Sequence, residues 1–140
     1  MTSDTLITRA LEAVPYAQTL GAKPIFIGEE LTLILPYSAD NIGNPVLPAL
    51  HGGAIGGFME LAAIAELIHS ASEEDLSNLP KPIGINIDYL RRGRPVDTYA
   101  RAAVFKRGSR VVNVRVRAWQ EDYDNPIAAL HGNFLIPSDG

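Results

Sequence analysis

The residues of this sequence best suited to chemistry are His51, the glycine pair Gly52 and Gly53, and the carboxylate Glu60, nine residues after the histidine. Glycine is disfavoured in helices by about 1 kcal/mol relative to alanine, so a glycine pair where an apolar helical run begins calls for an explanation. One explanation is that a reacting group must approach the free backbone N–H groups there. Amides at a helix N-terminus stabilise a developing negative charge, which predicts acyl chemistry.

Helix geometry separates His51 from Glu60. Nine residues of α-helix rise about 13.5 Å and make about two and a half turns. The two side chains therefore point to opposite sides of one helix. If both serve one active site, two subunits must share that site, and each must contribute one of the two residues. This geometry links function to dimer formation.

Glu60 lies in a helical segment that is otherwise almost entirely apolar. A buried carboxylate is costly unless it is paired or hydrogen-bonded. Burial also raises the pKa of a carboxyl group, which suits a general base. The alternative is a structural role, either on a narrow hydrated stripe or in an ion pair with an arginine such as Arg101 or Arg115.

The other candidate residues also have structural explanations. A histidine such as His51 at the start of a helix is often a packed or capping residue, and Gly52 and Gly53 permit close contact between a helix and a strand. Asn44, in the preceding loop, suits a turn that it holds in place itself. Together, however, these residues form a site rich in hydrogen-bond donors, opposite a carboxylate.

Composition and motifs exclude several kinds of site. The 140 residues contain no cysteine, which excludes disulfides, thiolate metal sites and cysteine nucleophiles. His69 and His131 lack the spacing of metal ligands, and no serine has the setting of a nucleophile elbow. Basic residues with interleaved aromatics are too sparse for an RNA-binding sheet. We therefore expect no metal, no resident cofactor and no nucleic-acid partner.

Charge is distributed unevenly along the chain. The net charge is −4, yet ten of the twelve lysines and arginines fall within residues 81–117. A local anionic partner and solvent-exposed strand faces both explain such a segment. The apolar run over residues 54–68 is too short to span a bilayer, and residues 1–10 do not resemble a signal peptide. We therefore expect no membrane partner and a cytoplasmic location.

The hydrophobic pattern predicts the elements that position these residues. Helices are expected over residues 5–14 and 51–70, the second of them buried, with a loop over residues 38–48. Six strands are expected over residues 22–27, 30–35, 83–89, 96–106, 110–120 and 127–136. This order predicts an α+β fold in which an antiparallel sheet wraps around one long central helix. The chain is expected to form a single domain over residues 1–140, with an N-terminal helical segment over 1–20 and a core over about 21–137.

Several motifs together resemble the hotdog-fold thioesterases of the phenylacetic-acid-degradation type. The resemblance extends from about residue 15 to residue 136. The motifs that carry it are Asn44-Pro45, Leu50-His51-Gly52-Gly53, Glu60, Asp88-Tyr89-Leu90-Arg91, Gly93-Arg94-Pro95 and the closing segment over residues 128–134.

The resemblance implies a hotdog domain, in which the antiparallel sheet wraps around one helix, and dimers that commonly pair into tetramers. It also implies hydrolysis of acyl-coenzyme A thioesters at the subunit interface. The backbone N–H of Gly52 or Gly53 would form the oxyanion hole, and His51 and Asn44 would orient the thioester or the water. Glu60 of the other subunit would act as general base or nucleophile, at a position where most members carry aspartate.

Loop arginines suit bidentate contacts with the phosphates of coenzyme A. The candidates are Arg91, Arg92, Arg94, Arg107 and Arg110, with plain surface charge as the competing explanation. Several members of the family place a serine or threonine where this sequence has Pro82 or Ile83. A second hypothesis is therefore a protein that binds acyl-coenzyme A without turnover, and a third is a hotdog hydratase or dehydratase.

Overall fold

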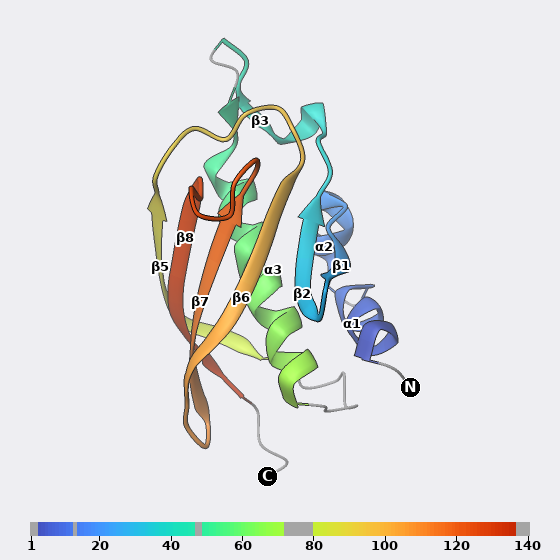
Figure 1. Cartoon of the computed structure of the whole chain (residues 1–140), viewed down its shortest axis with the longest axis vertical. Coiled ribbons are helices and arrows are strands. Elements are labelled where there is room, and N and C mark those ends of the chain that lie inside the picture. Colours follow the sequence, from blue (N-terminus) through green and yellow to red (C-terminus); the bar gives the residue numbers. More distant parts are fainter. Residues whose placement is uncertain (1–2, 13, 47–48, 72–79, 137–140) are drawn as a thin grey trace.

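A long central helix, α3 (Gly52–Ala71), lies along one face of a six-stranded antiparallel sheet (Figure 1). The computed structural model describes residues 3–12, 14–46, 49–71 and 80–136. In their order across the sheet, the strands are β1 (Lys23–Ile27), β2 (Glu30–Leu35), β6 (Thr98–Arg107), β7 (Val111–Trp119), β8 (Ala128–Leu135) and β5 (Lys81–Tyr89). This arrangement confirms the predicted antiparallel sheet around one helix.

Two short helices precede the sheet, α1 (Ser3–Glu12) and α2 (Pro15–Leu20), and both contact α3. The prediction of a single helix over residues 5–14 is therefore incomplete. Pro15 explains the division, because proline disfavours helical backbone at the residue before it and is well suited to the first position of a new helix. Gly21 ends α2 in the left-handed conformation, with φ of 74°.

The predicted loop over residues 38–48 contains regular structure. A 3-10 turn (Ala39–Asn41) leads into β3 (Ile42–Asn44), which pairs with β4 (Ala49–Leu50) in a small second sheet. β4 ends two residues before α3 begins. The pairing therefore closes the loop beside the start of the central helix.

The central strands alternate in burial, and their buried side chains face α3. Val112, Val114 and Val116 are buried toward α3. Arg115 and Arg117, the residues between and after them, are exposed on the outer face of the sheet. Most of α3 is buried, which agrees with its apolar sequence. Among the described residues, no helix is long and apolar enough to cross a membrane.

One edge of the sheet, β5, lies close to the start of α3. β8 pairs with one side of β5, and no other strand in the described part of the chain pairs with the opposite side. Ile83 is 56% exposed and Tyr89 54% exposed on this strand, and Leu90 follows with 55%. The free edge therefore carries large apolar side chains in contact with solvent.

Candidate active site

His51 caps the start of α3. Its Nδ1 accepts a hydrogen bond from the N–H of Gly53 at 2.9 Å, and its carbonyl oxygen accepts from Ala54 and Ile55 at 3.1 and 3.2 Å. The N–H of Gly53 is thus engaged. The N–H of Gly52 has no acceptor among the described residues. Of the two amides expected to form an oxyanion hole, only that of Gly52 is open to a ligand in this conformation.

The loop before the helix holds His51 in position. The N–H of His51 donates to the carbonyl oxygen of Asn41 at 2.7 Å, a contact that sequence reasoning missed. The Oδ1 of Asn44 accepts from the N–H of Val46 at 3.0 Å. This is the self-supporting turn expected of an asparagine in such a loop. In this structure, His51 and Asn44 therefore both make local structural hydrogen bonds.

Tyr89, at the end of β5, contacts one side of the first turns of α3. Its hydroxyl donates to the carbonyl oxygen of Gly52 at 2.8 Å. A Cβ atom on Gly52 would lie 3.5 Å from the tyrosine ring, and one on Gly56 would lie 3.3 Å from its hydroxyl. The sheet edge is therefore joined directly to the helix start.

Tyr16, on α2, contacts a second side of the same turns. Its hydroxyl donates to the carbonyl oxygen of Gly53 at 3.2 Å, and its ring covers Gly57. Sequence reasoning missed Tyr16, because the residue lies far from the motif in the chain. The signal that could have indicated it is the second glycine pair, Gly56 and Gly57, which leaves room for side chains from other elements.

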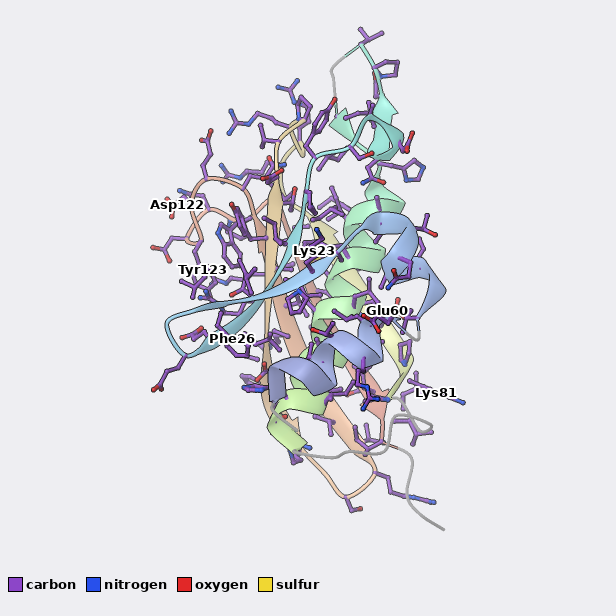
Figure 2. All side chains as sticks on the ribbon, turned by 90° about the vertical axis from the view of Figure 1, so that its right-hand side faces the viewer. Lys23, Phe26, Glu60, Lys81, Asp122 and Tyr123 are labelled. Carbon is purple, nitrogen blue, oxygen red and sulfur yellow. The ribbon has the colours of Figure 1, made fainter. Side chains whose placement is uncertain are left out.

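Glu60 is half-buried on the side of α3 that faces α1 and α2 (Figure 2). Burial raises the pKa of this carboxyl group above its usual value. The continuous helix over Gly52–Ala71 separates Glu60 from His51 by about two and a half turns. One chain therefore does not bring these two side chains together.

The alternative of an ion pair between Glu60 and Arg101 or Arg115 is wrong. Arg101 pairs with Glu30 at 3.1 Å, and Arg115 lies 3.8 Å from the centre of the Phe105 ring. Both arginines face away from α3, and no ion pair joins Glu60 to any residue that the structure describes. Within the same described ranges, no group of histidine, aspartate and glutamate side chains is placed to hold a metal ion.

The structure divides the five candidate phosphate-binding arginines into two groups. Three of them line one pocket of about 390 Å³: Arg91, Arg92 and Arg94. The other two lie at the turn between β6 and β7, at the opposite end of the sheet from the start of α3 (Figure 1). Of these two, Arg107 donates to the Oγ of Ser70 at 2.9 Å, near the end of α3. Arg107 and Arg110 are therefore far from the helix start.

The pocket lined by the first three arginines adjoins the helix start. The N–H of Leu50 donates to the carbonyl oxygen of Gly93 at 2.9 Å, and Gly93 packs against Leu50 and Ile55. Arg94 forms an ion pair with Glu121 across this pocket. No described residue pairs with the guanidinium of Arg91. The guanidinium of Arg91 therefore supplies positive charge in the loop that is hydrogen-bonded to Leu50, two residues before Gly52.

Comparison with known proteins places this geometry in a family. The model of the thioesterase superfamily matches residues 47–127. A solved structure from Pseudomonas aeruginosa is 30% identical, with a TM-score of 0.83 over 97% of this chain and 100% of that chain. A search of curated proteins finds no significant match.

Two further solved structures share the fold at lower identity. A phenylacetic acid degradation-related protein from Ralstonia eutropha JMP134 is 22% identical, with a TM-score of 0.75 over 94% of this chain and 99% of that chain. A protein from Bacillus halodurans, solved with CoA, is 17% identical, with a TM-score of 0.76 over 97% of this chain and 91% of that chain. Because the family model matches more than half of its length, this chain belongs to the thioesterase superfamily and has the hotdog fold.

Proposed function

We propose that this protein hydrolyses acyl-coenzyme A thioesters at a site that two subunits share. The observation that carries the proposal is the open N–H of Gly52 at the start of α3, where the neighbouring amides are already engaged. A thioester carbonyl directed at this amide would find a donor for the negative charge that develops on its oxygen. Membership of the thioesterase superfamily supports this assignment.

The hydrogen bonds around His51 make Gly52 a better donor than an isolated amide. The carbonyl oxygen of His51 accepts two hydrogen bonds, from Ala54 and Ile55. The N–H of Gly52 belongs to the same peptide group, so these bonds polarise it. We therefore assign the oxyanion hole to Gly52, with His51 as the cap that fixes its peptide plane.

Glu60 of the other subunit would act as the general base. It would take a proton from water as the water oxygen attacks the thioester carbon. The tetrahedral intermediate would then collapse with cleavage of the C–S bond, and Glu60 would return the proton to the departing thiolate of coenzyme A. The raised pKa of Glu60 suits a base better than it suits a nucleophile, because a more basic carboxylate accepts the proton more readily.

A dimer formed through β5 would complete the site. The unpaired edge of β5 exposes Ile83, Tyr89 and Leu90, and exposed apolar edges favour pairing with another chain. Tyr89 also contacts Gly52, so a second copy on this edge would lie close to the oxyanion hole. Further pairing of dimers into a tetramer is part of the same proposal.

The pocket beside the helix start would hold the phosphates of coenzyme A. Arg91 is the preferred ligand, because Arg94 is already paired with Glu121. Arg92 lines the same pocket. The CoA in the Bacillus halodurans structure supports this class of ligand. Arg107 and Arg110 are not included, since they lie at the other end of the sheet.

Binding of acyl-coenzyme A without turnover is the second candidate function. It is favoured by Pro82 and Ile83, neither of which offers a hydroxyl where several members of the family carry serine or threonine. Pro82 pairs with Phe134 near the beginning of β5, whereas Tyr89 ends that strand beside Gly52. A protein of this kind would retain the ligand pocket and lack hydrolysis.

Release of coenzyme A distinguishes the two functions. The purified protein is incubated with short-chain, medium-chain and aromatic acyl-coenzyme A thioesters, and free thiol is measured with a chromogenic reagent. The chain has no cysteine, so it contributes no background. We expect wild-type turnover of at least one thioester, with a loss of about 100-fold or more in Glu60→Gln.

Calorimetric titration of Glu60→Gln with the same thioester provides the control. Retained binding with lost turnover supports the hydrolase. Binding by the wild type without thiol release from any thioester would instead establish the second candidate.

A further inference from the structure

Two separate contacts hold Tyr16 against α3. Its hydroxyl donates to the carbonyl oxygen of Gly53 at 3.2 Å. Its ring lies so close to Gly57 that a Cβ atom there would be 2.1 Å from the Cε2 atom of Tyr16. A side chain at position 57 and the ring in its present place are therefore incompatible. The helix surface is shaped to accept this ring.

Glu60 is the next polar side chain on the same face of α3. Gly53, Gly57 and Glu60 follow the spacing i, i+4 and i+7, and helical side chains lean toward the helix N-terminus. The Glu60 side chain therefore leans toward the ring of Tyr16. The electrostatics agree, because burial and the negative charge of Glu60 both raise the pKa of Tyr16. The two residues are close neighbours within one subunit.

Exclusion of water raises the pKa of Glu60, and no charge on a described residue contributes to that rise. The charged side chains of α1 that the structure describes, Arg9 and Glu12, are exposed. From β5, Lys81 and Asp88 are exposed as well. α2 carries no charged residue, and Tyr16 is its one ionisable group. The pKa of Glu60 is therefore set by the side chains that cover its carboxylate and exclude water from it.

We propose that Tyr16 is a positioning residue for Glu60: its ring shields one side of the carboxylate from water, and its hydroxyl anchors the ring to the start of α3. The inference rests on the proposed hydrolysis, in which Glu60 is the general base. It assigns the N-terminal helices a part in catalysis, because α2 carries the shielding residue. In each subunit, the first turns of α3 then carry the oxyanion-hole amide of one site. The same turns also hold Tyr16 beside the general base of the other site.

The pH dependence of kcat/KM tests the role of the ring. A general base works when it is deprotonated, so activity falls as the pH falls through the pKa of Glu60. Tyr16→Ala admits water, lowers this pKa and moves the acid limb of the profile to lower pH, by about half a unit or more. Tyr16→Phe keeps the ring and its packing against Gly57 but loses the anchoring hydroxyl, so its acid limb lies closer to the wild-type position than that of Tyr16→Ala. The weaker base in Tyr16→Ala also lowers kcat more than it changes KM.

Gly57→Ala provides a matched variant, because it displaces the ring without changing Tyr16. We expect it to reproduce the profile of Tyr16→Ala, and the double variant to shift no further than either single variant. Tyr123→Ala is the negative control. Tyr123 lies on the far side of the sheet from Glu60 (Figure 2), and its removal leaves the profile unchanged.

A direct titration of Glu60 separates the inference from the proposed function. Carbon-13 NMR of protein labelled at the glutamate carboxyl groups follows the pKa of Glu60, with Glu60→Gln to identify its signal. If the wild type cleaves no thioester, the proposed function fails, yet this titration still tests the shielding. Unchanged titration of Glu60 in folded Tyr16→Ala would overturn the inference. If Tyr16→Ala does not fold, an unchanged titration in Gly57→Ala overturns it equally.

Discussion

At the scale of single residues, the site is defined by which backbone amides are already engaged. His51 occupies the N–H of Gly53 and, through its carbonyl oxygen, the next two amides, so that the N–H of Gly52 remains open. A helix start normally leaves several amides unsatisfied. Here the His51 cap satisfies the following three amides and leaves the N–H of Gly52 as the one directed donor. An oxyanion hole requires a directed donor of this kind.

Gly52→Pro tests this assignment by removing a single hydrogen-bond donor. Proline has no N–H and is favourable at the first position of a helix. A Cβ atom at position 52 meets Tyr89 only at ordinary contact distance, 3.5 Å. We expect kcat to fall by about 100- to 1,000-fold, with helix content and thermal midpoint close to those of the wild type. Full activity in a folded Gly52→Pro protein, measured by thiol release, would contradict the assignment.

The carboxyl group of Glu66, six residues after Glu60 on α3, predicts how stability depends on pH. Burial, and secondarily the negative charge of Glu30, raise the pKa of Glu66 from 4.5 to about 7. A carboxyl group whose pKa is higher in the folded state favours folding while it is protonated. That contribution is present below about pH 4.5 and is lost as the pH rises through about 7.

Glu66→Gln removes this dependence. The free energy of unfolding at pH 8 should therefore rise relative to the wild type by about 1 kcal/mol, after screening of this half-buried group. At pH 5 the two proteins should differ less. Denaturant titrations at both pH values measure the effect, with the exposed Glu29→Gln as the control. An equal difference at both pH values would show that Glu66 does not titrate in this range.

At the scale of elements, long periodic segments could be predicted and short ones could not. The central helix and the six strands of the main sheet follow from hydrophobic period alone, with ends within about two residues. α2 has only six residues, and β3 has only three. Segments this short carry little periodic signal, and contacts with α3 and β4 from elsewhere in the chain stabilise them.

The same distinction applies to the candidate site. Gly52, Gly53 and Glu60 could be selected from the sequence because each is an anomaly within an apolar helix. Tyr16 could not, because its contacts with Gly53 and Gly57 join residues about forty positions apart. The five candidate arginines show the opposite case, in which residues close in the sequence are far apart in the fold. Arg107 and Arg110 lie at the opposite end of the sheet from Arg91 and Arg92.

At the scale of the whole molecule, the arrangement is incomplete as a single chain. The open amide of Gly52 and the carboxylate of Glu60 are two turns apart on one helix. The free edge of β5 ends at Tyr89, beside that amide. A two-fold dimer repeats every contact, so it would form two equivalent sites, each with Gly52 from one chain and Glu60 from the other.

Mixing two inactive variants tests this sharing of residues. Gly52→Pro and Glu60→Gln subunits are unfolded together, refolded and assayed for thiol release. If the site is shared, a mixed dimer contains one site with both residues intact and one with neither. Random pairing makes half of the dimers mixed, so about a quarter of wild-type activity should return. If each chain carries its own complete site, every site retains one defect and mixing restores nothing. The mass of the refolded protein is measured in parallel, because a strict monomer would contradict the shared site independently of any activity.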